Sequence, residues 1–334
     1  MAERLHGDEL DVIGIGNALV DVLSQATDDA LVKLGLTKGT MHLIDEAQAA
    51  ALYDAMGQGI EISGGSAANT IVGVASLGGR AQYIGKVRDD QLGQVFRHDL
   101  RSTGVLYDVP LAPSGPPTGR CLIMVTPDAQ RTLNTFLGAS VHLGPEDVDP
   151  KLIARGRILY LEGYLFDPPR AQQAFREAAR QAHAAGRKVA LTLSDPFCVD
   201  RHRAAFLELV EHHVDIVLAN EAEICSLYQV ADFDAALQRV RGHCEIAALT
   251  RSEHGSVIVA GRDVHVIPAH PVAKLVDTTG AGDLYAAGVL FGLSRGRDLA
   301  TCGKLGSIAA AEVISHVGAR PMVPLATLAR DLLT

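Results

Sequence analysis

A series of short apolar runs, several of which alternate with helical patterns, most constrains what this chain can fold into. The runs cover residues 11–15, 82–84, 121–126, 158–161, 188–193, 216–219, 246–250 and 256–259. Helical patterns between them include residues 170–185 and 203–211. Continuous apolar strands that alternate with helices predict an α/β fold with a mostly parallel sheet, because helices must cover both faces of such strands. Ligands of these folds bind beyond the carboxyl ends of the strands.

Two segments, residues 18–45 and 105–138, break this rhythm. Both are rich in turn residues and short alternating runs, and the second has four prolines between residues 110 and 117. Such segments could pair into a small sheet that covers the ligand site, or they could be two separate surface excursions.

A turn of small residues lies between two carboxylates at residues 277–283, in the sequence Asp-Thr-Thr-Gly-Ala-Gly-Asp. An apolar, helix-like run follows it. Gly280, Ala281 and Gly282 carry almost no side chain, so a phosphate could approach their N–H groups at the positive end of the helix. Asp283 would then lie beside the transferring group. The alternative is an ordinary loop in which Asp283 only caps the helix.

A second cluster of small residues, Gly-Gly-Ser-Ala-Ala-Asn-Thr at 64–70, also lies between a strand-like segment and an apolar helical run. Two such loops in one chain suggest a ligand held between them. Neither loop has the spacing of a P-loop, and no zinc-protease motif occurs. Residues 14–19 begin like a dinucleotide-binding fingerprint, but Leu19 replaces its third glycine, which disfavours a Rossmann dehydrogenase.

Composition excludes several classes of function. The formal net charge of -9 and the lack of a long Lys or Arg run argue against nucleic acid as a partner. The longest uncharged stretch, residues 62–79, contains five glycines and is no membrane span, and the polar start does not resemble a signal peptide. Five cysteines without a C-x-x-C pair fit a reducing cytoplasm, where we expect the protein to act.

The two glycine loops, their order and the sequence between them resemble the ribokinase-like (PfkB) family of carbohydrate and nucleoside kinases. Residues 64–69 are similar to the N-terminal signature of the family, and residues 277–283 to its C-terminal signature. Residues 220–223, Asn-Glu-Ala-Glu, resemble its N-x-x-E motif. The resemblance extends from about residue 11 to residue 324.

This resemblance implies a three-layer α/β sandwich around a central, mostly parallel sheet, with a small β-sheet lid. We expect a single kinase chain over residues 1–334. The large domain would cover about 11–17, 46–104 and 139–330, and the lid about 18–45 and 105–138.

Within the family, the adenosine kinase branch is the most similar. Residues 16–21, Gly-Asn-Ala-Leu-Val-Asp, resemble its opening motif, and residues 193–197 resemble another of its segments. Two departures are Thr279, where many adenosine kinases carry Asn, and Ala18, where proline is common. The implied reaction transfers the γ-phosphate of ATP to the 5'-hydroxyl of adenosine, giving AMP. The alternatives are a kinase for a sugar such as ribose or fructose, a kinase for another nucleoside, and a catalytically silent sensor.

The resemblance also assigns roles to residues. Asp283 would be the general base, and the backbone of Gly280, Ala281 and Gly282 the anion hole. The substrate-binding residues would be Asn17, Asp21, Gly64, Gly65, Ser66, Asn69, Phe197 and Arg131. Asp21 would bind the ribose 2' and 3' hydroxyls, or it could be a turn aspartate. Phe197, with Tyr164 or Phe166, could supply a wall for a purine or could belong to the core, and Arg131 could reach the phosphates or form an exposed salt bridge in the lid.

For the nucleotide, the implied residues are Asn220, Thr250, Gly255, Thr278, Gly280 and Gly282. Glu223 would organise Mg²⁺ through water, unless it is a helix-surface charge. K⁺ could bind at Asp277 and Thr279. The expected cofactors are therefore ATP and Mg²⁺, with K⁺ as an additional candidate. The expected partner is a small nucleoside or sugar, and we expect a monomer rather than a homodimer formed through the lid.

Overall fold

The computed structural model describes residues 7–128 and 130–333 of the chain, and its larger sheet has eight strands in the order β13-β12-β11-β10-β9-β8-β1-β5. The strands are β1 (Leu10–Ile15), β5 (Ala81–Ile84), β8 (Gly156–Glu162), β9 (Lys188–Thr192), β10 (Ile216–Asn220), β11 (Ile246–Thr250), β12 (Ser256–Ala260) and β13 (Asp263–Ile267). The six strands β11, β10, β9, β8, β1 and β5 pair in parallel, whereas β12 and β13 form an antiparallel edge next to β11. The mostly parallel sheet predicted from the apolar runs is confirmed.

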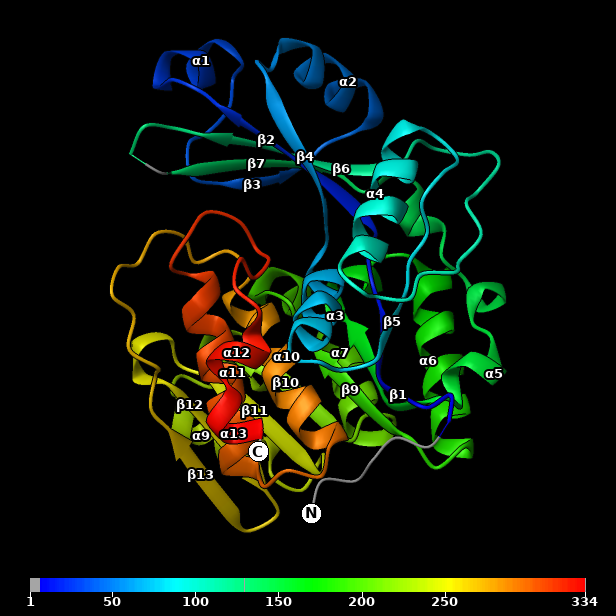
Figure 1. Ribbon diagram of the computed structural model, residues 1–334, viewed down its shortest axis with the longest axis vertical. Helices are drawn as coiled ribbons and strands as arrows, with labels where there is room; N and C mark the ends of the chain where they lie inside the picture. Colours follow the sequence, from blue (N-terminus) through cyan, green and yellow to red (C-terminus); the bar gives the residue numbers. More distant parts are fainter. Residues whose placement is uncertain (1–6, 129, 334) are drawn as a thin grey trace.

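Helices cover both faces of this sheet (Figure 1). One face packs against α3 (Ser66–Ser76), α10 (Ala281–Ser294) and α11 (Leu299–Val313). The other packs against α6 (Pro169–Ala184), α7 (Pro196–His212), α8 (Glu221–Tyr228) and α9 (Phe233–Val240). Alternate strand residues point to opposite faces, so in β8 Ile158 and Tyr160 join the first core while Leu159 and Leu161 join the second. These two cores make the expected three layers.

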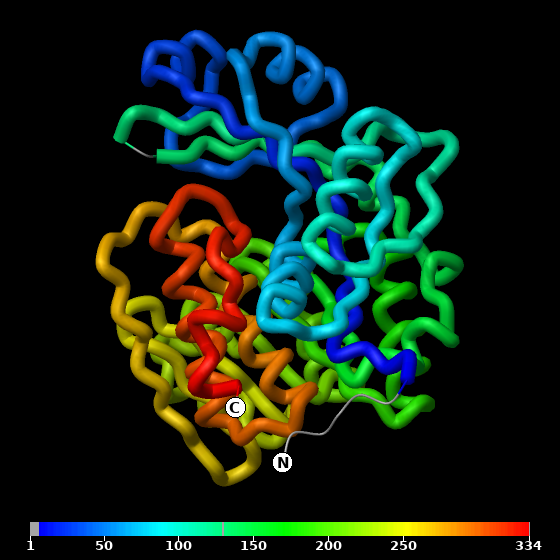
Figure 2. Tube along the Cα trace, in the orientation of Figure 1, coloured from blue at the N-terminus to red at the C-terminus, as the bar shows by residue number. Residues whose placement is uncertain are grey.

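A second sheet of five strands, in the order β3-β7-β6-β2-β4, lies above the first (Figures 1 and 2). Its strands are β2 (Leu19–Gln25), β3 (Met41–Leu43), β4 (Gly59–Gly64), β6 (Gly119–Val125) and β7 (Arg131–Phe136). Strand β2 pairs in parallel with β6, and β3 in parallel with β7. The two turn-rich segments therefore do pair into one small sheet, and the alternative of separate surface excursions is wrong.

The structure draws the edge of the lid differently from the sequence. Strand β4 pairs antiparallel with β2, and α2 (Glu46–Ala55) packs on β6 and β7, whereas the family resemblance predicts that residues 46–104 belong to the large domain. Conversely, the start of the second segment stays with the large sheet, where Leu106 bridges to Gln82 and Tyr107 is fully buried. A strand-like pattern predicts a strand but does not say which sheet it joins.

The remaining elements are short or peripheral. They are α1 (Asp28–Lys33), α4 (Gln91–Ser102), α5 (Pro150–Ile153), α12 (Leu325–Leu328) and α13 (Arg330–Leu333), with 3-10 turns at Gly138–His142, Pro145–Asp147, Gly163–Phe166 and Ser252–His254. No helix in the described part of the chain combines the length and the hydropathy that a membrane span requires.

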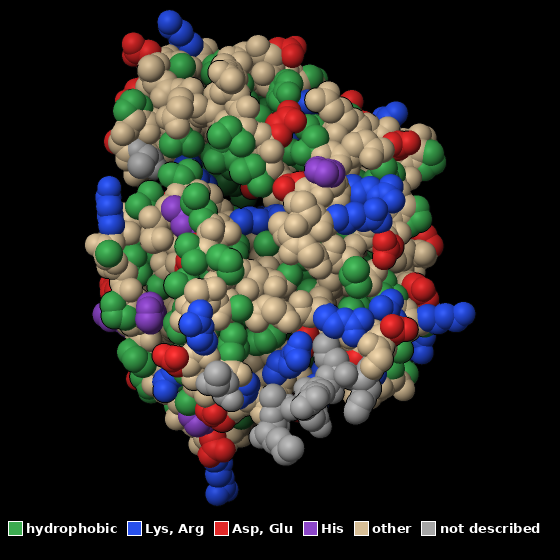
Figure 3. All heavy atoms as spheres, viewed as in Figure 1, with side chains coloured by type: hydrophobic (Ala, Val, Ile, Leu, Met, Phe, Trp, Pro, Cys, Tyr) green, Lys and Arg blue, Asp and Glu red, His purple; other side chains and the backbone are tan. Residues whose placement is uncertain are grey.

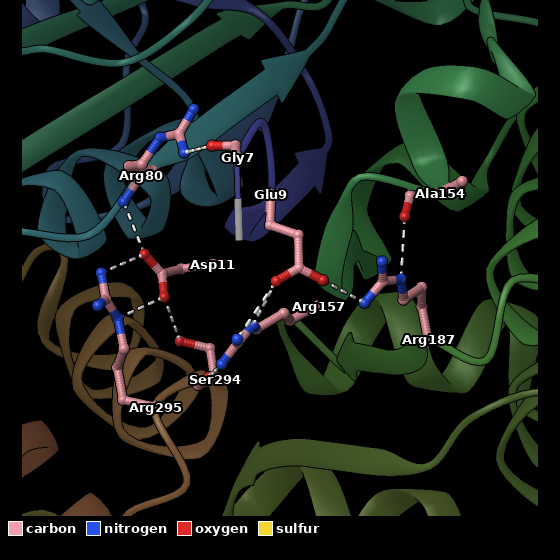
Figure 4. A network of polar contacts seen from close by, with 9 residues as sticks. All are labelled: Gly7, Glu9, Asp11, Arg80, Ala154, Arg157, Arg187, Ser294 and Arg295. Atoms are coloured by element: carbon pink, nitrogen blue, oxygen red, sulfur yellow. Dashed lines mark hydrogen bonds and ion pairs between the residues drawn. The ribbon is translucent and has the colours of Figure 1, made fainter. Parts of the chain in front are cut away.

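A polar network fixes the amino end of β1, opposite the carboxyl ends of the strands (Figure 4). Asp11, which is fully buried, pairs with Arg295 at the end of α10, with 2.6 Å between Oδ1 and Nε. Glu9 pairs with both Arg157 and Arg187, at 3.3 and 2.9 Å. These pairs connect the first strand to β8, to the segment before β9 and to α10, so they brace the sheet at the end remote from the glycine loops.

Candidate active site

A cavity of about 760 Å³ lies between the two sheets, at the carboxyl ends of the parallel strands. The last residues of β8, β9, β10 and β11 all line it, namely Glu162, Thr192, Asn220 and Thr250. Figure 3 shows a hollow between the upper and lower parts of the molecule, with hydrophobic side chains on its upper rim. This is the place where the topology of an α/β sheet predicts a ligand.

Most of the predicted site residues meet in this cavity. Those that line it are Asn17, Asp21, Gly65, Ser66, Asn69, Phe197, Asn220, Glu223, Thr250, Thr278, Thr279, Gly280, Ala281, Gly282 and Asp283. Gly64, Arg131 and Asp277 lie next to lining residues instead, and Gly255 lies in the turn between β11 and β12. The two glycine loops, more than 200 residues apart in sequence, therefore do face one ligand-sized space.

The turn before α10 leaves two amides open to a ligand. Gly280 has a φ of 80°, and a Cβ there would lie 2.8 Å from the Cα of Ala319, so a side chain is excluded. A Cβ at Gly282 would meet no atom within 4 Å, so the space in front of the first turn is empty. Among the described residues, the N–H groups of Gly280 and Gly282 have no partner, whereas that of Ala281 donates to the Thr278 carbonyl at 3.2 Å. Two of the three expected anion-hole amides are thus available, and the third stabilises the turn.

Asp283 lies in the first turn of α10, and side chains of α3 hold both of its oxygens. Ser66 Oγ donates to Oδ1 at 2.6 Å, and Asn69 Nδ2 donates to Oδ2 at 3.0 Å. Burial raises the pKa of Asp283 above its ordinary value, while the two hydrogen bonds and the charge of Arg320 oppose that rise. The carboxylate is fixed in position with lone pairs left to accept a proton, so it is more than a helix cap.

Asp21, at the third position of β2, reaches into the same cavity from the lid. A Cβ at Gly64 would lie 2.5 Å from its carboxyl carbon, which explains why that position is a glycine. Burial raises the pKa of Asp21 to about 6, and the charges of Arg320 and Arg131 oppose the rise. Its carboxylate accepts no hydrogen bond from the described residues, so it is free to accept bonds from a ligand.

Glu162, which the sequence reasoning missed, connects two segments that carry predicted substrate-binding residues, 16–21 and 64–70. It is 1% exposed at the end of β8, and it accepts bonds from Asn17 N, Asn17 Nδ2 and Ala67 N at 3.1, 3.0 and 2.7 Å. Burial raises its pKa to about 7, although these three donors favour the charged form. The only sequence signal was a charged residue at the end of an apolar run, which such sheets place at the ligand site.

Asn220 and Glu223 form a reciprocal cap at the start of α8. Asn220 N and Nδ2 donate to the two oxygens of Glu223 at 3.0 and 2.5 Å, and Glu223 N donates to Asn220 Oδ1 at 2.9 Å. Glu223 is only 5% exposed, so the alternative of a helix-surface charge is wrong. Burial raises its pKa to about 7. Both residues line the cavity, and a buried carboxylate there is an oxygen ligand that suits a hydrated Mg²⁺ ion.

Arg131 connects the lid to the turn at 277–283. Its Nη2 lies 2.6 Å from Asp277 Oδ2, in an ion pair that is not aligned as a hydrogen bond, and its Nη1 donates to Thr279 Oγ1 at 3.1 Å. Both side chains of the pair are 9% exposed, so the alternative of an exposed lid salt bridge is wrong. Asp277 also accepts bonds from Thr279 and from Gly318 N. The oxygens suggested for K⁺ are therefore engaged by protein donors.

Two of the three aromatic residues that could form a wall for a purine line the cavity, and the third belongs to the core. Phe166 belongs to the core beneath α6 and α7, and Phe197 lines the cavity but is 74% exposed. Tyr164 does line the cavity. Aliphatic and sulfur-bearing side chains from the lid cover this region instead, namely Leu19, Met41, Leu43, Cys121, Ile123 and Leu133. The sequence signal for them was the alternation of the lid strands, which does not show where each strand faces.

Gly255 serves the fold rather than the cavity. It has a φ of 81°, a Cβ there would collide with the Ile267 carbonyl oxygen, and its own carbonyl accepts a bond from Arg251 N at 2.7 Å. It therefore shapes the turn between β11 and β12, next to Thr250.

Comparison with known proteins identifies the family. Residues 29–326 match the pfkB family carbohydrate kinase profile. The chain belongs to the pfkB family of carbohydrate kinases. It is thus a phosphotransferase that acts on an alcohol group, and the family implies that it uses ATP. Both signature loops and the N-x-x-E motif line its cavity.

Relatives of this pfkB-family chain carry both nucleoside and sugar kinase names. The crystal structure of adenosine kinase from Sinorhizobium meliloti is 53% identical, with a TM-score of 0.90 over 97% of this chain and 99% of that one. A probable sugar kinase protein from Rhizobium etli is 50% identical, with a TM-score of 0.91 over 97% and 98%. Adenosine kinase from Saccharomyces cerevisiae is 28% identical over 92% of this chain and 95% of its own.

Proposed function

We propose that the chain is an adenosine kinase that transfers the γ-phosphate of ATP to the 5'-hydroxyl of adenosine. The observation that carries this proposal is the arrangement around Asp283. Ser66 and Asn69 hold its carboxylate in the first turn of α10, next to N–H groups without a partner among the described residues. A carboxylate from the lid, Asp21, faces the same cavity. The 53% identity to the Sinorhizobium meliloti adenosine kinase supports adenosine as the acceptor.

In this proposal Asp283 accepts the proton of the 5'-hydroxyl as that oxygen attacks the γ-phosphorus. The transition state of phosphoryl transfer is loose, so the proton leaves late and a weak base suffices. The free N–H groups of Gly280 and Gly282 would donate to phosphate oxygens as charge shifts during the transfer. Asp21 would accept hydrogen bonds from the ribose 2' and 3' hydroxyls, because its oxygens are free in this structure.

The base of adenosine would lie against the aliphatic lid wall. Ile123 and Leu133 face the cavity from adjacent strands of the lid, and Leu43 extends that wall from β3. A flat purine gains from burial against such side chains even without an aromatic partner, at about 25 cal/mol per Å² of apolar surface. A free sugar has no comparable apolar surface, so this wall favours a nucleoside.

Asn220 and Glu223 would hold the hydration shell of Mg²⁺, with Thr250 and Thr278 beside the nucleotide. When bound, Mg²⁺ neutralises phosphate charge. The K⁺ proposal has weaker support, because Arg131 and Gly318 N engage Asp277 Oδ2 and Thr279 engages Oδ1.

A sugar kinase is the second candidate. It is favoured by the name of the Rhizobium etli structure, and by the position of Phe166 in the core, which leaves fewer aromatic rings to stack on a base. The sensor alternative lacks support, because a sensor has no need of an oriented base such as Asp283.

An acceptor screen separates these candidates. ADP release would be measured with adenosine, inosine, cytidine, ribose and fructose, each with Mg²⁺ and with either K⁺ or a large organic cation. We expect adenosine to give the highest kcat/KM. A preference for ribose or fructose would reject the nucleoside assignment, and ADP release that does not depend on any acceptor would reject the kinase assignment for these substrates.

A further inference from the structure

Arg320 is a buried cation beside the proposed base, in the loop between α11 and α12. Its Nε donates to Asn69 Oδ1 at 3.1 Å. Its two Nη atoms are shielded from solvent and have no hydrogen-bond partner among the described residues. Neither sequence motif includes this residue, and it does not line the cavity itself. A buried guanidinium with free donors is costly, so its position needs a reason.

The bond from Arg320 fixes which way the Asn69 amide points. A guanidinium nitrogen can only donate, so it must meet the amide oxygen of Asn69. The amide nitrogen is then turned to Asp283 Oδ2, to which it donates at 3.0 Å. If the amide were reversed, an oxygen would face a carboxylate and a donor would face a donor. The two hydrogen bonds from Arg320 to Asn69 and from Asn69 to Asp283 therefore have one stable direction, and the second of them ends on the base.

Arg320 also supplies positive charge where negative charge accumulates. The titratable or charged groups that interact electrostatically with Asp283 are Asp21, Glu162, Glu223, Tyr160, Tyr164 and Arg320. Arg320 is the cation in this set, and it lies near Asp21 and Asp99 as well. Its charge lowers the pKa of Asp283 against the effect of burial.

We propose that Arg320 is a positioning residue for Asp283, which orients the base through Asn69 and keeps it ionised in a cavity rich in carboxylates. This inference rests on the proposed function, because it concerns the base of that reaction. An anion-binding role for the free Nη donors is less favoured, since Asp21, Asp99 and Asp283 interact electrostatically with Arg320 and would repel an anionic ligand.

Three substitutions separate the hydrogen bond from the charge. Arg320→Gln places an amide nitrogen where Nε lies and so keeps the donor without the charge. Arg320→Lys keeps the charge but lacks a donor at that position, and Arg320→Met removes both. Arg187→Met is the matched control, because Arg187 is also a largely shielded arginine, but it pairs with Glu9 at the amino ends of the strands.

The kinetic readout is the pH profile of kcat/KM with the best acceptor. We expect the acidic limb to move upward by about one pH unit in Arg320→Met and Arg320→Gln, but not in Arg320→Lys or the Arg187 control. At the pH optimum, kcat should fall about tenfold in Arg320→Met and Arg320→Lys, which lose the orienting donor, and less in Arg320→Gln. A uniform fall in all three variants with an unmoved limb would overturn the proposal.

A second readout does not depend on activity. The ¹³Cγ resonance of Asp283, assigned by its loss in Asp283→Asn, can be followed against pH in each folded variant. We expect its midpoint to rise in Arg320→Met relative to wild type and to remain near wild type in Arg320→Lys. Equal midpoints in wild type and Arg320→Met would refute the role of Arg320, whereas an inactive wild type with the expected midpoints would refute only the proposed function.

Discussion

Glu162 allows a quantitative test of how the site is built. Its carboxylate is almost completely buried, and it accepts hydrogen bonds from both substrate loops. Replacing it by Gln preserves the shape and removes the charge. The amide resembles the protonated acid, so Glu162→Gln imitates the form of the protein that exists at low pH.

The pKa of Glu162 gives the expected magnitude. Burial raises this pKa from 4.5 to about 7. At a pH between these two values, Glu162 is protonated in the folded protein but ionised in the unfolded chain. The contribution of this proton to the free energy of unfolding is fully present below pH 4.5 and is lost as the pH rises through about 7. A difference of about 2.5 pH units corresponds to about 3 kcal/mol. Wild type should lose that much more stability than Glu162→Gln between pH 4.5 and pH 8.

Urea unfolding at intervals of pH measures this difference directly, because the free energy of unfolding is obtained at each pH from a linear extrapolation. Glu253→Gln is the control, since Glu253 has an 80% exposed side chain and should keep the pH dependence of wild type. Other buried carboxylates, such as Asp21 and Glu223, contribute equally to both proteins and cancel. If the free energies of unfolding of wild type and Glu162→Gln change in parallel with pH, the reasoning is refuted. If wild type instead becomes more stable relative to the variant as the pH rises, the three hydrogen-bond donors outweigh burial.

Three further substitutions test the proposed chemistry. Asp283→Asn should fold normally and lose at least about a hundredfold in kcat, measured by ADP release, because the general base is removed; near-normal turnover would reject its role. Asp21→Asn should raise KM for the nucleoside about tenfold or more and reduce the preference for ribo- over 2'-deoxynucleosides, because its oxygens are proposed to bind the hydroxyls. Arg131→Met should lower the thermal midpoint of unfolding, since it leaves Asp277 buried without its cation, and should raise KM for ATP; an unchanged midpoint would indicate that Gly318 N and Thr279 satisfy Asp277 alone.

The fold was largely predictable because its signals are local. Buried parallel strands leave continuous apolar runs, and seven of the eight runs named from the sequence fall on strands of the larger sheet. The run at 121–126 falls on β6 of the lid instead. Sheet membership depends on pairing between distant segments, and for the same reason β4 was assigned to the large domain rather than to the lid.

The site was predictable where the chemistry requires a short motif. Small residues at 280–282 and at 65 follow from a backbone that a ligand must approach, and these positions do line the cavity. Glu162 and Arg320 are different, because each acts through contacts with residues that are far away in the sequence. A lone charged residue has many possible roles in a sequence, and only its partners distinguish them.

The charged residues of the site are divided between the lid and the body, which couples the site to the lid. Asp21 and Arg131 lie on lid strands β2 and β7, whereas Asp277, Asp283 and Arg320 belong to the body of the molecule. Movement of the lid away from the body would separate Arg131 from Asp277. The electrostatic free energy lost in this step is larger than for an exposed pair, because both side chains are shielded from water. The phosphates of ATP carry more negative charge than one carboxylate, so they would compete with Asp277 for this guanidinium. The lid would then be held by the nucleotide that it covers, and its closure would bring Asp21 to the acceptor at the same time.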